Sequence, residues 1–142
     1  MQTVRQLLAG KPAAIYTVDA EDPVRVAIQL MADHHIGALP VMRGAELAGI
    51  VSERDYARKV VLLGRNSTQT QVWQIMTTPV TTVCPDDTVQ HCMQLMTDMR
   101  FRHLPVVDGG ALAGMISIGD CVRSVIEAQQ HEIDELRRYI AT

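Results

Sequence analysis

The second half of this sequence repeats the first half in a fixed register. Leu39-Pro40-Val41 recurs 65 residues later as Leu104-Pro105-Val106, and Leu47-Ala48-Gly49 recurs at the same spacing as Leu112-Ala113-Gly114. The correspondence needs no gap between residues 16 and 60. Because chance does not preserve one register over such a length, the chain is a tandem duplication whose two copies are expected to share one fold.

The segments that lead into the two copies also correspond. Val4–Leu8 resembles Val72–Met76, but at a spacing of 68 residues, so the first copy carries three extra residues near Gly10-Lys11-Pro12. The stretch 65–71 between the copies is polar and follows Gly64, a suitable residue to end a helix. We therefore divide the chain into a first repeat, a linker and a second repeat, at 1–64, 65–71 and 72–142.

Each copy predicts the element order β-α-β-β-α. A short β-branched segment comes first, at 15–18 and 80–83. A helix with an apolar residue every three or four positions follows, then two apolar runs around a glycine-containing turn, then a second helix near Asp55 or Asp120. Because both helices cover the same face of the sheet, the other face of a single copy would be left bare. We therefore expect an α+β fold in which the repeats pack sheet to sheet with pseudo-twofold symmetry, leaving clefts between them.

Both copies carry the same motif where the last strand meets the following helix. Gly49-Ile50-Val51-Ser52-Glu53-Arg54-Asp55 and Gly114-Met115-Ile116-Ser117-Ile118-Gly119-Asp120 share a glycine, two apolar residues, a serine and an aspartate three positions later. Backbone N–H groups at a helix start attract phosphate. An ionised carboxylate accepts the hydroxyl protons of a ribose, and Arg58 and Arg123 can face an anion. The alternative is a capping box that only satisfies backbone donors, but its occurrence in both copies favours a binding site.

With the Leu-Pro-Val strands, these junctions make the sequence resemble a CBS-domain pair, the tandem module named after cystathionine β-synthase. The resemblance covers essentially the whole chain. It implies a non-catalytic regulatory module that binds AMP, or else ADP, ATP, NAD or S-adenosylmethionine, between the repeats and signals to a partner protein. It assigns the ribose hydroxyls to Asp55 and Asp120 and the phosphate to Ser52 and Ser117. It places the adenine against two segments, formed by Thr17, Val18 and Ala38, and by Thr82, Val83 and His103.

The two clefts are not expected to be equal. Arg102 and His103 precede the second Leu-Pro-Val strand, whereas the uncharged Gly37-Ala38 precedes the first. Conversely, the first junction carries Glu53-Arg54 where the second has Ile118-Gly119. We therefore expect both clefts to accept adenosine groups in different phosphate environments, one favouring a monophosphate and the other a longer or dinucleotide ligand.

Charge and cysteine usage narrow the class of protein. The formal net charge of −3 and the pI of about 5.9 argue against a nucleic-acid binder. No apolar run approaches the roughly 20 residues of a membrane span, and the N-terminus lacks the apolar core of a signal peptide. Three cysteines, without a paired spacing, suit a reducing compartment, so we expect a cytoplasmic protein.

The remaining reactive side chains predict neither a metal site nor catalysis. His34, His35 and His91 lack partners at a zinc-like spacing, and Cys92 lies on an apolar helix stripe where a buried, unreactive thiol is expected. No phosphate loop with its lysine and no nucleophile elbow is present. Beside the nucleotide sensor, the sequence leaves open a structural dimerisation module with vestigial clefts and, less favoured, a small enzyme built on these residues.

The stretch from Cys121 to Ile140 is long for a closing helix. An apolar stripe with coiled-coil-like spacing runs along it, formed by Ile126, Gln129, Ile133, Leu136 and Ile140. This stripe can pack on its own repeat. Because the part beyond Gln130 has no counterpart in the first copy, we expect it instead to contact a second subunit in a homodimer. An effector protein of unknown identity is the other expected partner.

Overall fold

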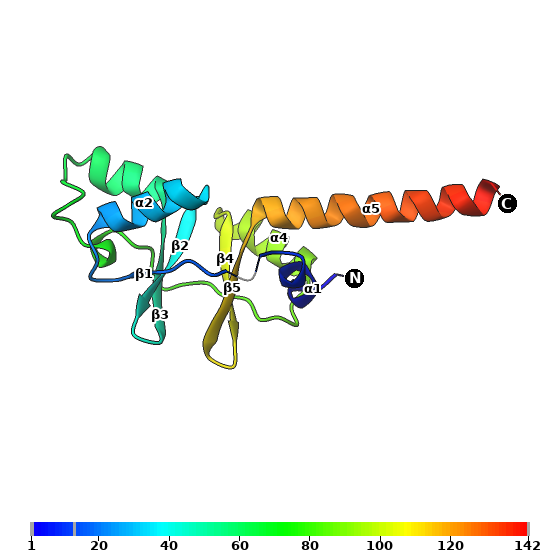
Figure 1. Ribbon diagram of the computed structural model, residues 1–142, viewed down its shortest axis with the longest axis horizontal. Coiled ribbons are helices and arrows are strands. Elements are labelled where there is room, and N and C mark those ends of the chain that lie inside the picture. Colours follow the sequence, from blue (N-terminus) through cyan, green and yellow to red (C-terminus); the bar gives the residue numbers. More distant parts are fainter. Residues whose placement is uncertain (1, 13, 142) are drawn as a thin grey trace.

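Two similar repeats lie side by side in the computed structural model, and one long helix projects from the second of them (Figure 1). The structure describes residues 2–12 and 14–141. The predicted α+β fold is confirmed, with tandem repeats of sheet and helices packed sheet to sheet about a pseudo-twofold axis. The order of elements along the chain follows the duplication that the sequence displays.

The first repeat is built on a three-stranded sheet. Its elements are β1 (Val18–Asp19), α2 (Val24–His34), β2 (Ala38–Arg43), β3 (Glu46–Ser52) and α3 (Glu53–Tyr56), which continues into a π-helical turn at Ala57–Val61. β1 runs parallel to β2, and β2 pairs with β3 in antiparallel register, with Leu39 opposite Val51. In the turn between β2 and β3, Gly44 has a φ of +61°, a conformation that glycine adopts without steric cost.

The second repeat has the same plan with a smaller sheet. Its elements are α4 (Val89–Met99), β4 (His103–Asp108), β5 (Ala111–Ser117) and α5 (Ile118–Ala141). β4 and β5 pair in antiparallel register, and β5 contacts β3 where the repeats meet. The strand expected at 80–83 is reduced to one parallel bridge between Val83 and Val106. Val18 in the first repeat and Val83 in the second are each buried in a core, which explains why these positions keep their pairing.

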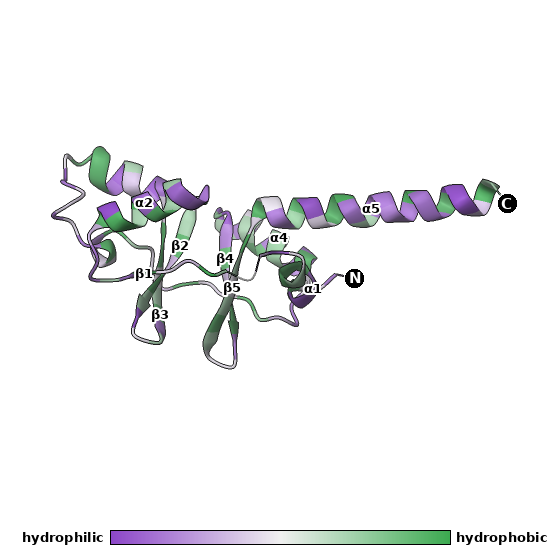
Figure 2. Cartoon of the chain, viewed as in Figure 1, coloured by the Kyte–Doolittle hydropathy of each residue, from purple (hydrophilic) through white to green (hydrophobic). Residues whose placement is uncertain are grey.

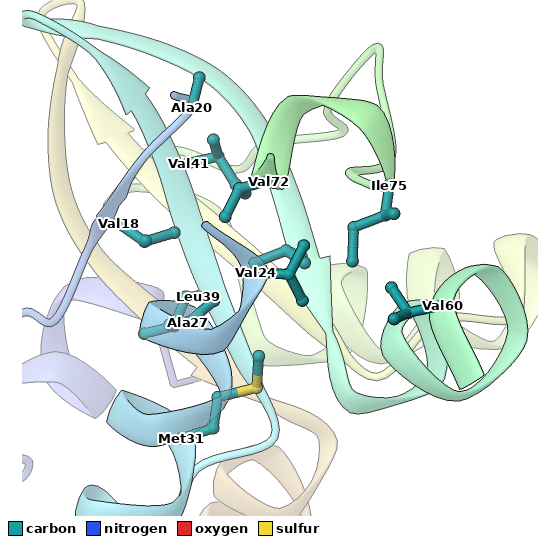
Figure 3. Close-up of a cluster of buried hydrophobic side chains, with 11 residues drawn as sticks. Val18, Ala20, Val24, Ala27, Met31, Leu39, Val41, Val60, Val72 and Ile75 are labelled. Atoms are coloured by element: carbon teal, nitrogen blue, oxygen red, sulfur yellow. The ribbon is translucent and has the colours of Figure 1, made fainter. Parts of the chain in front are cut away.

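The segments that enter the two repeats exchange places in space. Helix α1 (Val4–Ala9) buries Val4 and Leu7 in the core of the second repeat. The 3₁₀ turn η2 (Val72–Gln74) and the residue that follows it bury Val72 and Ile75 in the core of the first (Figure 3). The predicted division at 1–64 and 72–142 describes the order along the chain. In space, each hydrophobic core includes the entry segment of the other half.

The glycine of each junction motif permits this crossed packing. A Cβ added at Gly49 would lie 2.6 Å from the sulfur of Met76, and one added at Gly114 would lie 2.9 Å from Cδ2 of Leu8. Both distances are shorter than real Cβ contacts, so a side chain at either position would collide with an entry segment. In both repeats, therefore, the absence of a side chain at the motif glycine leaves room for the entry segment that packs against it.

Helix α5 extends far beyond the body of the molecule. Its first turns pack on α4, β5 and α1, and the remainder runs free of the two cores (Figure 1). Hydrophobic residues recur along this otherwise hydrophilic part (Figure 2), and several are strongly exposed, namely Ile126, Leu136 and Ile140. None of the helices in the described ranges is both long and apolar enough to cross a lipid bilayer.

The crossed packing can be tested by truncating a side chain of one entry segment. Ile75 is fully buried in the first core, so Ile75→Ala should lower the free energy of unfolding by about 2–5 kcal/mol. In native-state hydrogen exchange, amides of β2 and β3 should lose protection first, because their core is the one that loses the contact. The exposed neighbour Gln74→Ala is the control. Greater loss in β4 and β5 would contradict the exchange of segments.

Candidate functional site

Two clefts open between the repeats, one beside each junction motif. The Asp55 cleft has a volume of about 640 Å³ and combines the first junction with residues 79–81 and 99–103 of the second repeat. The Asp120 cleft, of about 600 Å³, combines the second junction with residues 14–16 and 34–38 of the first. Each cleft therefore takes its carboxylate from one repeat and its opposite wall from the other. Both volumes lie in the range that suits a small-molecule ligand.

Asp55 is 9% exposed, and its carboxylate contacts Ser52, Lys59 and Thr77. Its Oδ2 accepts hydrogen bonds from the backbone N–H and the hydroxyl of Ser52, at 3.0 and 3.1 Å. Its Oδ1 lies 3.0 Å from the Lys59 ammonium and accepts a longer hydrogen bond, 3.3 Å, from the Thr77 hydroxyl. Lys59 also donates to the carbonyl of Ile75, so it joins the carboxylate to the entry segment of the second repeat.

Asp120 is held by two cations. Its Oδ2 accepts from the Ser117 N–H at 2.9 Å and from the Lys11 ammonium at 2.7 Å, and its Oδ1 accepts from the Arg123 guanidinium at 2.7 Å. Lys11 belongs to the three extra residues of the first copy and also donates to the carbonyl of Met115. Burial raises the pKa of Asp120, but the hydrogen bonds from Lys11 and Ser117 outweigh burial and hold its pKa below the usual value.

Both aspartates also complete the helix cap that was the alternative reading of the motif. Ser52 Oγ accepts the Asp55 N–H, and Ser117 Oγ accepts the Asp120 N–H, each at 3.1 Å. Capping occupies only part of each carboxylate, which has about four acceptor positions. The positions that face the clefts are filled by Lys59 and Thr77 at Asp55, and by Lys11 and Arg123 at Asp120. A ligand that used either carboxylate would have to replace these neighbours.

The structure brings most of the predicted site residues to the clefts. The Asp55 cleft is lined by Ser52, Arg54, Asp55, Arg58 and Arg102. The Asp120 cleft is lined by Ser117, Asp120 and Arg123. Ala38 and His103 line both clefts, and they are the first residues of the equivalent strands β2 and β4.

Four predicted residues lie outside the lining of both clefts. Val18 and Val83 are buried in the two cores, and Thr17 and Thr82 are exposed elsewhere. The cleft walls are formed instead by residues one to three positions earlier, Ile15 and Tyr16 on one side and Val80 and Thr81 on the other. The observed lining residues precede the predicted ones because Val18 and Val83 pair with β2 and β4 and point into the cores.

Sequence reasoning missed several lining residues. Lys11 was visible only as part of an insertion, and Lys59 lies one turn beyond Asp55, a spacing that in itself indicates an ion pair. Arg100 lines the Asp55 cleft from the residue that ends α4, where its φ is +60°. In the Asp120 cleft the rings of Tyr16 and His34 stack with centroids 3.7 Å apart, a contact between distant residues that no local pattern announces.

His103 lies between the two clefts in a largely buried position. Burial lowers its pKa, Asp120 partly opposes this change, and the charges of Lys11 and Arg102 add to it. These surroundings favour the neutral form of the imidazole, which lines both clefts.

Cys92 and Cys121 are buried, whereas Cys84 is exposed. Burial raises the pKa of Cys92 to about 12 and that of Cys121 to about 11, so both thiols are protonated at neutral pH. Within residues 2–12 and 14–141, no three His, Cys, Asp or Glu side chains converge as they would around a metal ion.

The depressed pKa of Asp120 predicts how stability depends on pH. Its folded pKa lies below the unfolded value of about 3.9, so its contribution is present above that pH and is lost as the pH falls through the folded pKa. Asp120→Asn keeps a capping oxygen but loses the ion pairs, and should cost about 1.5–3 kcal/mol at pH 7. Urea unfolding at pH 7, 5 and 3 should show this difference shrinking below about pH 4. Asp108→Asn, at the exposed end of β4, is the control, and a difference that does not change with pH would refute the ion-pair explanation.

Comparison with known proteins agrees with this architecture. The family model of the CBS domain matches residues 11–62 and again residues 72–127. The mitochondrial CBS domain-containing protein CBSX3 of Arabidopsis thaliana is 45% identical over 84% of this chain, which spans 61% of that relative's length. The CBS domain-containing protein YhcV of Bacillus subtilis is 33% identical, with 84% of this chain and 83% of that protein covered.

A solved structure gives the same result in three dimensions. A CBS-domain protein of the signal-transduction class from Burkholderia ambifaria MC40-6 is 56% identical and superimposes with a TM-score of 0.87, covering 90% of this chain and 96% of the other. The two matched segments are the two repeats in which the junction motifs lie. The chain belongs to the CBS-domain family and carries two CBS domains in tandem.

Proposed function

We propose that this protein binds an adenosine-containing nucleotide in the clefts between its repeats and has no catalytic activity of its own. One observation carries the proposal. In each cleft a buried carboxylate at a helix start faces the wall of the other repeat across a cavity of about 600–640 Å³. A ribose presents two adjacent hydroxyl donors to such a carboxylate, as in dinucleotide-binding folds. The helix start beside it offers backbone N–H groups and a positive dipole to a phosphate.

The walls opposite the carboxylates suit a flat, mostly apolar base. In the Asp55 cleft they include Val80, Phe101 and Pro105. In the Asp120 cleft they include Ile15 and the stacked rings of Tyr16 and His34. Ribose recognition by one repeat and base recognition by the other supports a ligand that bridges the two.

Bridging gives the ligand a means of regulation. A ligand that contacts both repeats favours whichever relative arrangement of the repeats allows both sets of contacts. It shifts the equilibrium by the difference between its affinities for the two arrangements, and an effector protein that reads the arrangement responds by the same coupling energy. The protonated thiols suit the reducing cytoplasm that we propose as its location.

A second candidate function rests on the capping contacts. Because both aspartates already bond their own helix starts and a lysine, the clefts would also be stable as purely structural junctions. In that case the chain is a dimerisation module, and its clefts bind nothing at physiological concentration.

A ligand panel distinguishes these functions. If nucleotides bind, millimolar AMP, ADP, ATP, NAD or S-adenosylmethionine raises the melting temperature of the full chain. Asp55→Asn and Asp120→Asn, which keep a capping oxygen, should each weaken binding in their own cleft by about 1.5–3 kcal/mol in calorimetric titration. Asp108→Asn serves again as the control. Unchanged melting temperatures with every ligand would favour the structural module.

We propose further that the protein forms a homodimer through helix α5. Ile126, Ile133, Leu136 and Ile140 are separated by 7, 3 and 4 residues, the spacing of a coiled-coil seam, and are 58%, 43%, 60% and 80% exposed. A second copy offers the same stripe, so the contact is self-complementary in a twofold dimer.

One substitution on this stripe tests the dimer. Leu136→Glu places a charge in the seam without touching either core, so sedimentation at micromolar concentration should change from dimer to monomer while the melting curve of the repeats remains cooperative. Glu132→Gln on the same helix should leave the dimer intact. A wild-type monomer, or a dimer that survives Leu136→Glu, would exclude this interface.

A further inference from the structure

The duplication allows the two clefts to be compared position by position. Three cations lie on the junction side of the Asp55 cleft and two on its opposite wall; they are Arg54, Arg58, Lys59, Arg100 and Arg102. At the equivalent positions, 65 residues away, the other cleft has a single cation among Gly119, Arg123, Ser124, His35 and Gly37. Five lysine or arginine side chains therefore line the Asp55 cleft, whereas two line the Asp120 cleft, namely Arg123 and Lys11 of the insertion.

Most of these cations are not neutralised by the protein itself. Lys59 pairs with Asp55, but the four arginines have no carboxylate within ion-pair distance among residues 2–12 and 14–141. In the Asp120 cleft the situation is reversed, because Lys11 and Arg123 both bond the carboxylate. Unpaired arginines in a cleft with apolar walls attract an anion strongly, and each offers a planar fork that binds two phosphate oxygens.

The arrangement of the cations favours an extended anion over a compact one. Arg54, Arg58 and Lys59 follow β3, whereas Arg100 and Arg102 lie between α4 and β4 in the other repeat. A phosphate at the helix start lies beside the first group, and a longer chain of phosphates offers further oxygens to the second group on the opposite wall.

The helix after β3 differs between the repeats as well. Arg58 and Lys59 lie in the π-helical turn at Ala57–Val61, whereas the equivalent segment of the second repeat continues as regular α-helix within α5. Such turns occur frequently at functional sites. This backbone difference is independent of the charge difference and coincides with it.

We infer that the Asp55 cleft selects nucleotides with two or more phosphates, whereas the Asp120 cleft binds adenosine ligands with little regard to phosphate number. The inference rests on the proposed function and gives each cleft its own ligand class. When ribose hydroxyls replace Lys59 on Asp55, the released ammonium becomes a fifth cation for the polyphosphate. At Asp120 the ligand competes with Lys11 and Arg123 and gains fewer unpaired charges in return.

Calorimetric titration of the full chain with adenosine, AMP, ADP and ATP tests the assignment. Asp55→Asn identifies which binding event belongs to the Asp55 cleft. At that cleft affinity should increase by roughly 10- to 100-fold from AMP to ATP, and inorganic tripolyphosphate should compete with ATP. Arg100→Gln combined with Arg102→Gln should weaken ATP binding by a similar factor. It should weaken adenosine binding by less than about threefold, since only phosphate contacts are lost. Both arginines are exposed, so folding should be unaffected.

Arg123→Gln in the other cleft is the matched control and should leave the ATP affinity of the Asp55 cleft unchanged. The inference would be overturned, with the proposed function intact, by equal affinity for AMP and ATP at the Asp55 cleft. The same holds if the double substitution at Arg100 and Arg102 leaves the ATP affinity unchanged. Tripolyphosphate binding without binding of any adenosine ligand would overturn both, because the cleft would then recognise the anion alone.

Discussion

Neither repeat completes its hydrophobic core without a segment from the other half of the chain. Leu8 packs against Gly114 and Met76 against Gly49, so closely that a side chain at either glycine would require its neighbour to shift. This crossing fixes the two repeats against one another, and it brings each junction motif opposite a wall of the other repeat. The clefts therefore exist only in the assembled pair, and a single copy would expose half of each of them. The duplication is thus a requirement of the site as well as of the core.

Buried carboxylates impose a second constraint, because an ionised group removed from water needs compensating charge. Asp55 obtains it from Lys59, one helical turn away. At the equivalent position of the second repeat stands Ser124, whose hydroxyl bonds Gln2, so Asp120 obtains its cation from Lys11 in the other half of the chain. Each lysine also donates to a backbone carbonyl across the repeat boundary, Lys59 to Ile75 and Lys11 to Met115. Both carboxylates are therefore part of the contact between the repeats.

The architecture could be predicted from the sequence because the duplication displays each local pattern twice. The sequence also located Ser52, Asp55 and their second-repeat equivalents, since a motif of seven consecutive residues needs no tertiary information. It failed where placement depends on contacts between distant segments. The register of the first strands put Val18 and Val83 in the cores and moved the cleft lining to Tyr16 and its neighbours. The stacking of Tyr16 on His34 and the ion pair of Lys11 with Asp120 join residues 18 and 109 positions apart, and no periodicity encodes such pairs.

The two copies differ in charge at several positions that line the clefts. Core positions such as Val41 and Val106 are interchangeable, whereas Arg102 corresponds to Gly37 and Arg54 to Gly119. Packing tolerates few changes of volume, so it holds the shared fold in place while exposed cleft positions remain free to change charge. The three-residue insertion also changes the charge of a cleft, because it adds Lys11 to the Asp120 cleft and leaves both cores intact. The duplicated scaffold therefore presents two clefts of unequal charge, and the crossed entry segments join the two repeats that form them.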